Sequence, residues 1–163
     1  MLSMIEEFEP VVKGIITLTN EWESRLAELP IDVIKERKNS QNRNIKQIIG
    51  HMVDSASNNT HRMVHLQYQQ SPFLFPNYAT SGNNDRWIAI QDYEDEEWNV
   101  LVPLWKFSNL HVAHVIVNID RDKIENRWVA GPGELVSLKD MVLDYLRHFY
   151  LHLAEIEELA APC

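Results

Sequence analysis

The 163-residue sequence has little that would support a disulfide, a cysteine-based metal site or a nucleic-acid interface. Its only cysteine is Cys163, the last residue, so no disulfide can close within the chain and no cysteine cage can hold a metal. The formal net charge is −9 and the basic residues are scattered, whereas a phosphate-binding surface needs clustered Lys and Arg. We therefore expect no nucleic-acid partner, and the cysteine usage agrees with a reducing cytoplasm.

Long apolar runs are also missing. No uninterrupted apolar stretch approaches the roughly 20 residues that span a bilayer. The N-terminal sequence MLSMIEEFEP is acidic and lacks the basic leader and apolar run of a secretory signal. These absences predict a soluble cytoplasmic protein with no membrane partner. Because no repeat or linker interrupts the chain, we expect one domain spanning residues 1–163.

Four long segments carry apolar residues at helical spacing, and they define the predicted fold. They run from about Ser3 to Leu29, Ile45 to Gln69, Asp95 to Ile119 and Leu138 to Leu159. The connection SPFLFPNYATSGNN, residues 71–84, has the length of a lid or binding loop, and a short helix is expected in the following DRWIAIQDY. The segments ENRWVA and ELVS could pair as a small hairpin. We predict an all-α protein, a four-helix bundle with long connections.

The second predicted helix combines an apolar face with a polar one, beginning in IIGHMVDSASNN. At about 100° per residue, one row of polar side chains follows the edge of the apolar arc: His51, Ser55, Asn58, Asn59 and Arg62. Asp54 points further outward, which favours a structural role. The row is either the solvated flank of a core helix or the lining of a site.

The last predicted helix places two histidines at or near its core. His152 falls inside the apolar arc and His148 on its edge, with Asp144 and Glu155 on the same flank. His61 and His65 have the same spacing but lie opposite the apolar arc of their helix, so we expect them to face solvent. On the third helix, His111 sits at the edge of the apolar face, as an ordinary boundary histidine or a residue that supports a site.

Histidines four residues apart share one helix face and can bind one metal. A third imidazole, His51 from a facing helix, would complete a set of three nitrogen ligands. Three protein ligands leave positions open for water or substrate, as in catalytic metal sites. Imidazole suits Zn²⁺ and Ni²⁺, and also Fe and Cu. Many helical H-x-x-x-H pairs bind no metal, so two hydrogen-bonded boundary histidines are the alternative.

Two stretches together resemble the DinB-like family: IIGHMVDSASNNTHRM and, about a hundred residues later, DYLRHFYLHLAEIEEL. That family includes bacillithiol transferases, other thiol-dependent enzymes and metal-dependent hydrolases. The resemblance covers nearly the whole chain. It implies a DinB-like four-helix bundle, a homodimer and a divalent metal bound by His51, His148 and His152. It implies neither DNA binding nor one particular reaction.

The sequence thus predicts a metal-dependent enzyme that acts on a small molecule. It would transfer a low-molecular-weight thiol cosubstrate to an electrophile, or hydrolyse its substrate, with Zn or Ni as the metal. Metal-bound imidazoles usually donate their other N–H, which makes Asn58, Asp144 and Glu155 candidate supporting groups. Arg62, Trp87 or Arg147 could meet an anionic substrate, although surface or structural roles are commoner for such residues. The alternatives are a non-catalytic metal- or ligand-binding bundle and a structural bundle without metal.

Overall fold

A computed structural model describes residues 4–80 and 82–162, and it contains the four predicted long helices. They are α1 (Glu9–Ala27), α3 (Ile45–Tyr68), α5 (Trp98–Val117) and α6 (Leu138–Ala160). The shorter elements are η1 (Glu6–Phe8), α2 (Ile31–Glu36), α4 (Asn83–Gln91), η2 (Arg121–Lys123), β1 (Arg127–Gly131) and β2 (Glu134–Ser137). The predicted all-α four-helix bundle with long connections is therefore confirmed.

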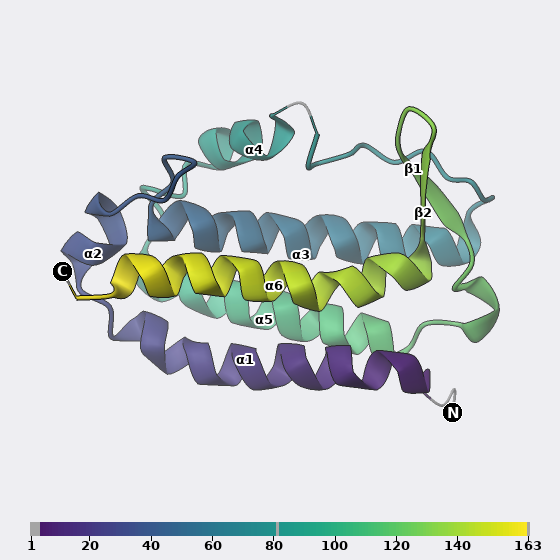
Figure 1. Cartoon of the computed structure of the whole chain (residues 1–163), viewed down its shortest axis with the longest axis horizontal. Helices are drawn as coiled ribbons and strands as arrows, with labels where there is room; N and C mark the ends of the chain where they lie inside the picture. The colour runs from purple at the N-terminus through teal and green to yellow at the C-terminus, as the bar shows by residue number, and fades with distance from the viewer. Residues whose placement is uncertain (1–3, 81, 163) are drawn as a thin grey trace.

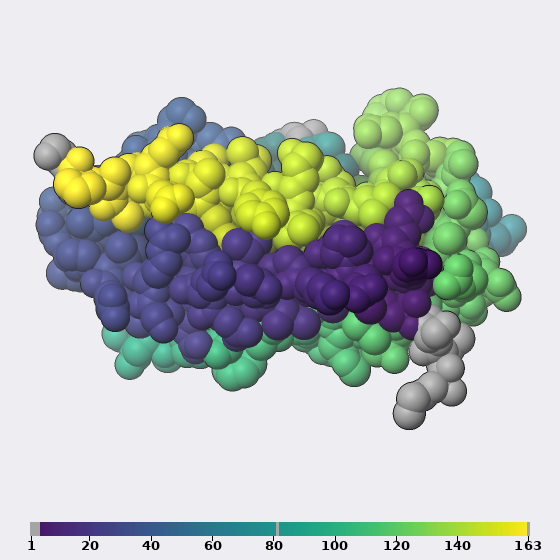
Figure 2. Space-filling model, turned by 60° about the horizontal axis from the view of Figure 1, so that its bottom comes forward, coloured from purple at the N-terminus to yellow at the C-terminus, as the bar shows by residue number. Residues whose placement is uncertain are grey.

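The long helices form a ring in which α1 and α3 are diagonal partners. Each of these two helices packs against both α5 and α6. Helices α3 and α5 run in the same direction, because the connection through α4 returns along the bundle before α5 begins (Figure 1). On the face shown in Figure 2, α6 lies directly beside α1, and the hairpin projects at one end. A site between α3 and α6 therefore lies between neighbouring helices.

Local sequence signals fix where the two helices that carry the histidines begin. Asn44 accepts a hydrogen bond from the Gln47 backbone N–H, and the Gln47 side chain accepts one from Asn44, which makes a capping box for α3. Ser137 caps α6 by accepting from the Asp140 backbone N–H at 3.0 Å. These caps fix the first turns of α3 and α6.

Side chains from all four long helices fill the core. Trp105 of α5 stacks on Phe149 of α6 with ring centroids 5.8 Å apart, and both side chains are fully buried. Nearby, the Tyr145 hydroxyl donates to Asn109 Oδ1 at 2.7 Å, which satisfies two polar groups inside the bundle. By length and composition α5 could cross a membrane, but its most buried residues pack against α1 and α3. This packing accounts for the apolar residues on the buried face of α5, while Val100, Leu104 and Phe107 are exposed.

The predicted hairpin is present, and the long loop after α3 attaches to it. Strands β1 and β2 pair antiparallel, and Gly133 takes a positive φ of 75° in the turn. The loop residue Phe73 donates its backbone N–H to Arg127 and accepts one from Val129, at 2.8 and 2.9 Å. Asn77 Nδ2 also donates to the Ala130 carbonyl at 2.7 Å. The loop and the hairpin together close one side of the α3–α6 interface.

The structure differs from the sequence prediction at several element ends. The six-residue helix α2 was not predicted, because it is too short to show a helical period. Helix α5 begins at Trp98 rather than near Asp95 and continues through Pro103. The start predicted at Ser3 lies outside the described residues, and the described chain enters α1 through the short helix η1.

Candidate metal centre and pocket

Three histidines from two neighbouring helices converge at the centre of the bundle. His51 projects from α3, and His148 and His152 project from successive turns of α6. One ring nitrogen of each lies within 4.8 Å of those of the other two. The ring of His51 is 4.6 Å from that of His152 and 5.5 Å from that of His148, centroid to centroid. The structure thus brings together the three side chains that the sequence predicted as ligands.

The spacing of these donor atoms suits a single divalent metal. The Nε2 atoms of His148 and His152 are 3.1 Å apart. Two nitrogens bound at 2.0–2.1 Å to a tetrahedral zinc are about 3.3 Å apart, so this pair is already at ligand spacing. A small movement of one ring toward the others would complete the set. The residues present therefore fit a metal bound by three imidazoles.

Hydrogen bonds to the outer nitrogens orient two of the three rings. Tyr78 Oη lies 2.6 Å from His51 Nδ1, and Glu155 Oε2 lies 2.9 Å from His152 Nδ1. Both contacts leave Nε2 as the nitrogen for a metal, an arrangement typical of metal-binding histidines. The placement of Glu155 agrees with its predicted supporting role. Tyr78 was not singled out from the sequence, although it lies in the loop expected to shape the pocket.

A buried carboxylate extends the support of His51. Asp54 accepts hydrogen bonds from Tyr93 at 2.6 Å and Gln91 at 2.7 Å, and a longer one from Tyr78 at 3.4 Å. Burial raises the pKa of Asp54, and the hydrogen bonds from Tyr93, Gln91 and Tyr78 oppose that rise. A line of contacts therefore connects the imidazole of His51 through Tyr78 to Asp54.

Burial also keeps the imidazoles neutral. Together with a smaller effect of neighbouring imidazoles, it lowers the pKa of His51 to about 2 and that of His148 to about 4. The pKa of His152 is lowered by burial as well, although the carboxylate of Glu155 opposes the change. Neutral imidazole is the form that binds metal, because a proton and a metal compete for the same lone pair.

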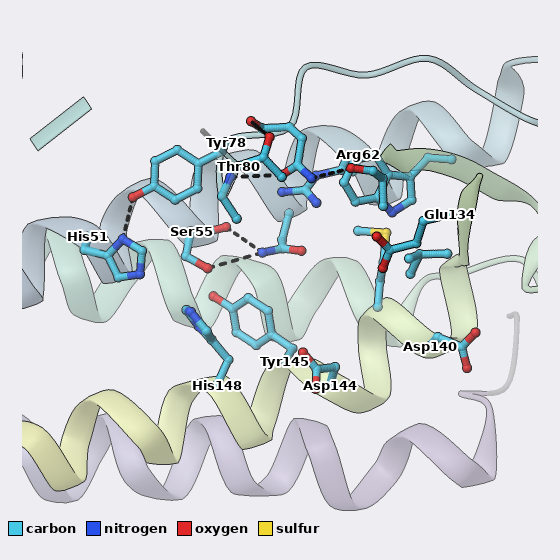
Figure 3. A pocket seen from close by; sticks show the side chains of 17 residues that line it. His51, Ser55, Arg62, Tyr78, Thr80, Glu134, Asp140, Asp144, Tyr145 and His148 are labelled. Atoms are coloured by element: carbon cyan, nitrogen blue, oxygen red, sulfur yellow. Dashed lines mark hydrogen bonds between the residues drawn. The ribbon is translucent and has the colours of Figure 1, made fainter. Parts of the chain in front are cut away.

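A pocket of about 540 Å³ opens from the histidines toward the hairpin. His51 and His148 line one end, while Arg62 and Glu134 line the other (Figure 3). Residues 77–80 of the long loop form part of the wall. A small molecule in this pocket can therefore contact the two histidines and the hairpin at the same time.

The other predicted site residues occupy different positions. Ser55, Asn59, Arg62 and Asp144 line the pocket, and Asp144 also pairs with Arg147 through contacts of 2.5 and 3.0 Å. Asn58 is buried, and its side chain donates to the Asp54 carbonyl at 2.9 Å. His111 lies exposed on α5 beside His114, with ring centroids 6.2 Å apart. The structure therefore brings the polar row of α3, except Asn58, to the pocket and leaves His111 away from it.

Two predictions about the outer face of α3 are wrong. Asp54 was expected to point outward, yet only 2% of it is exposed, because Tyr93 and Gln91 cover that side of the helix. His65 was expected to face solvent but is half-buried, with its ring stacked 5.3 Å from that of Phe73. The angles around the helix axis predict only which side of α3 faces the other long helices. The long loop and the α4 region cover part of the opposite side.

Comparison with known proteins gives structural likenesses without detectable sequence relatives. No family profile and no curated protein matches the sequence. YfiT from Bacillus subtilis, described as a probable metal-dependent hydrolase with an unusual four-helix bundle topology, superposes with a TM-score of 0.78. The identity is 15%, over 98% of this chain and 89% of YfiT.

A mycothiol-dependent maleylpyruvate isomerase, matched through two of its crystal structures, superposes with a TM-score of 0.73. The identity is 13%, over 91% of this chain, and the match covers 60% of the isomerase. Both proteins share the architecture while differing almost entirely in sequence. The comparisons therefore establish the fold, and this chain has the predicted four-helix bundle, with the overall arrangement of YfiT.

Proposed function

We propose that this protein is a metal-dependent enzyme in which His51, His148 and His152 bind one divalent metal, with zinc or nickel the best candidates. The observation that carries the proposal is the convergence of three neutral imidazoles, two of which line one end of a pocket. A divalent metal bound there would supply Lewis acidity and would acidify a bound water or thiol. The description of YfiT as a probable metal-dependent hydrolase supports the same chemistry here.

We further propose that the substrate is a small molecule, because the pocket encloses only about 540 Å³. Within it, Tyr78 and Glu155 hold two of the imidazoles in place. Residues of the loop and hairpin enclose the bound molecule and limit its contact with water. The reaction is either transfer of a thiol to a small electrophile or hydrolysis. The mycothiol dependence of the isomerase favours a thiol cosubstrate, and the hydrolase description of YfiT favours hydrolysis.

Metal analysis tests whether the three histidines bind a metal. Protein purified without a histidine tag and incubated with Zn²⁺ or Ni²⁺ should retain about one metal ion per chain, as measured by inductively coupled plasma mass spectrometry. His51→Ala and His148→Ala should each lose it. His61→Ala is the matched control, since His61 lies on the same helix as His51 but is exposed. A wild-type protein that stays metal-free would contradict the proposal.

Activity assays then separate an enzyme from a binding protein. The metal-loaded protein is screened with several thiols combined with electrophiles, and with ester and amide substrates for hydrolysis. Turnover should disappear in His148→Ala and after chelation. Equal turnover without metal would contradict the mechanism, and metal binding without turnover of any substrate would favour a non-catalytic binding bundle.

A further inference from the structure

Arg62 is a buried cation whose guanidinium has no acidic partner among the described residues. Only 7% of the residue is exposed, and burial lowers its pKa to about 10, so it stays charged at neutral pH. In the described part of the chain its one hydrogen bond runs from Nε to the Asn58 carbonyl at 3.4 Å, and no carboxylate lies within 4 Å. A buried charge without a counterion is costly, so a residue in this state is a candidate to bind an anion.

Two aromatic rings hold the guanidinium in the pocket wall. Its Cζ lies 4.3 Å from the ring centroid of Trp128 and 5.7 Å from that of Phe75. A cation over an aromatic ring is stabilised without donating a hydrogen bond, so the terminal N–H groups of Arg62 remain available to an anion. A planar carboxylate matches that edge, because it can accept two parallel hydrogen bonds.

The charges around Arg62 restrict the kind of anion. Three carboxylates line the same pocket, and two of them already have partners. Asp140 accepts from the Ser137 hydroxyl at 2.7 Å, and Asp144 pairs with Arg147. Glu134 is exposed on β2. Asp140 and Glu134, which have no cationic partner among the described residues, would repel a polyanion such as a nucleotide, whereas a single carboxylate can be neutralised by Arg62 alone.

The position of Arg62 along α3 restricts the shape of the ligand. It follows His51 by eleven residues on one continuous helix, which separates their Cα atoms by about 16 Å. Figure 3 shows Arg62 toward the hairpin and His51 at the opposite end of the pocket. We propose that Arg62 binds the single carboxylate at the far end of an elongated small molecule whose reacting group lies at the histidines. The placement of the reacting group at the histidines rests on the proposed metal function.

The first experiment compares acids with amides on the wild-type protein. The probes are linear ω-mercapto carboxylic acids of increasing chain length and their primary amides, titrated calorimetrically into zinc-loaded protein. The thiol provides a ligand that zinc prefers. The acid should bind about ten- to a hundredfold more tightly than its amide, as expected for a charge-assisted pair. The preference should appear only at chain lengths that reach Arg62. Equal affinities at all lengths would overturn the proposal.

Variants assign the preference to one side chain. Arg62→Gln should abolish it, and Arg62→Lys should retain only part of it, because lysine keeps the charge but loses the planar fork. Arg127→Gln is the matched control, since it removes the same charge one residue from Trp128 at an exposed position outside the pocket lining. A loss of preference in Arg127→Gln as large as that in Arg62→Gln would indicate a general charge effect and overturn the assignment.

A metal-independent measurement distinguishes failure of this inference from failure of the metal proposal. In metal-free protein the Arg62 Nε–H signal in a ¹⁵N NMR spectrum, assigned through its absence in Arg62→Lys, should move on addition of the acids but not of the amides. If the protein bound no zinc, this shift would still support the carboxylate subsite. If zinc bound but the signal did not move, the subsite would be refuted while the metal site stood.

Discussion

Tyr78 connects the outer nitrogen of His51 to the buried carboxylate of Asp54. If His51 presents Nε2 to a metal, its Nδ1–H donates to Tyr78, and the tyrosine hydroxyl donates onward to Asp54. The Tyr78 hydroxyl then accepts one hydrogen bond and donates the other. Tyr93 and Gln91 hold the carboxylate from the other side, so the orientation of His51 depends on residues from three segments of the chain.

We predict that Tyr78→Phe weakens zinc binding by about tenfold, because losing the outer partner of a metal-binding histidine typically costs ten- to a hundredfold. Competition with a chromophoric zinc chelator measures the change. The matched control is Tyr68→Phe, which removes a hydroxyl 2.6 Å from Nδ1 of His65, a histidine outside the metal cluster. Equal zinc affinity in Tyr78→Phe and wild type would show that the hydroxyl does not orient His51 for the metal.

At the scale of elements, the close approach of Tyr93 to α3 depends on a glycine. A Cβ atom added at Gly50 would lie 2.2 Å from the ring of Tyr93, which its hydrogen bond to Asp54 holds in place. A Cβ at Gly14 in α1 would also be close, 2.6 Å from Leu146, but that atom ends a flexible side chain. The two glycines therefore allow different kinds of helix contact.

We predict that Gly50→Ala lowers the free energy of unfolding by about 1–3 kcal/mol, the usual cost of overpacking. Gly14→Ala should change it less, because alanine favours the helix by up to about 1 kcal/mol and Leu146 can change rotamer. Urea unfolding followed by circular dichroism measures both. A Gly50→Ala protein as stable as Gly14→Ala would mean that the Tyr93 ring moves without cost.

The same elements show how far sequence reasoning reaches. Helical spacing located the four long helices and the inward side of each, and with the family resemblance it predicted His51, His148 and His152 as metal ligands. It could not place Asp54 or Arg62 fully, because their burial depends on segments that have no long period of their own. Asp54 is covered by the α4 region and Arg62 by the hairpin, and both contacts form only in the folded chain. Tyr78 was missed for the same reason.

At the scale of the whole molecule, the candidate metal ligands join two helices that are far apart in sequence. His51 lies on α3 and the other two on α6, so the folded chain can assemble the set. A metal that binds the folded state more tightly than the unfolded chain stabilises the bundle. The single-domain organisation, the homodimer and the cytoplasmic location remain predictions from the sequence and the family resemblance.

We predict that zinc at about a hundred times its Kd stabilises the protein by roughly 3 kcal/mol. For a chain of this size this corresponds to a rise in Tm of about 5–10 °C. Differential scanning calorimetry measures the shift, and His51→Ala should show little of it. Mg²⁺ serves as the control cation because it prefers oxygen ligands. An equal rise with Mg²⁺, or with zinc in His51→Ala, would place the stabilising ion elsewhere.

The backbone pairing of Phe73 with the hairpin has a consequence for how this scaffold could be altered. Tyr78, near the histidines, and Trp128, beside Arg62, belong to segments that are joined by Phe73 and by the Asn77–Ala130 hydrogen bond. Loop and hairpin thus form one hydrogen-bonded cover over the helices that carry the candidate metal ligands. We expect that exchanging the loop and the hairpin together, with the hydrogen bonds between them kept, would change the substrate preference. Grafting either segment alone would break those hydrogen bonds.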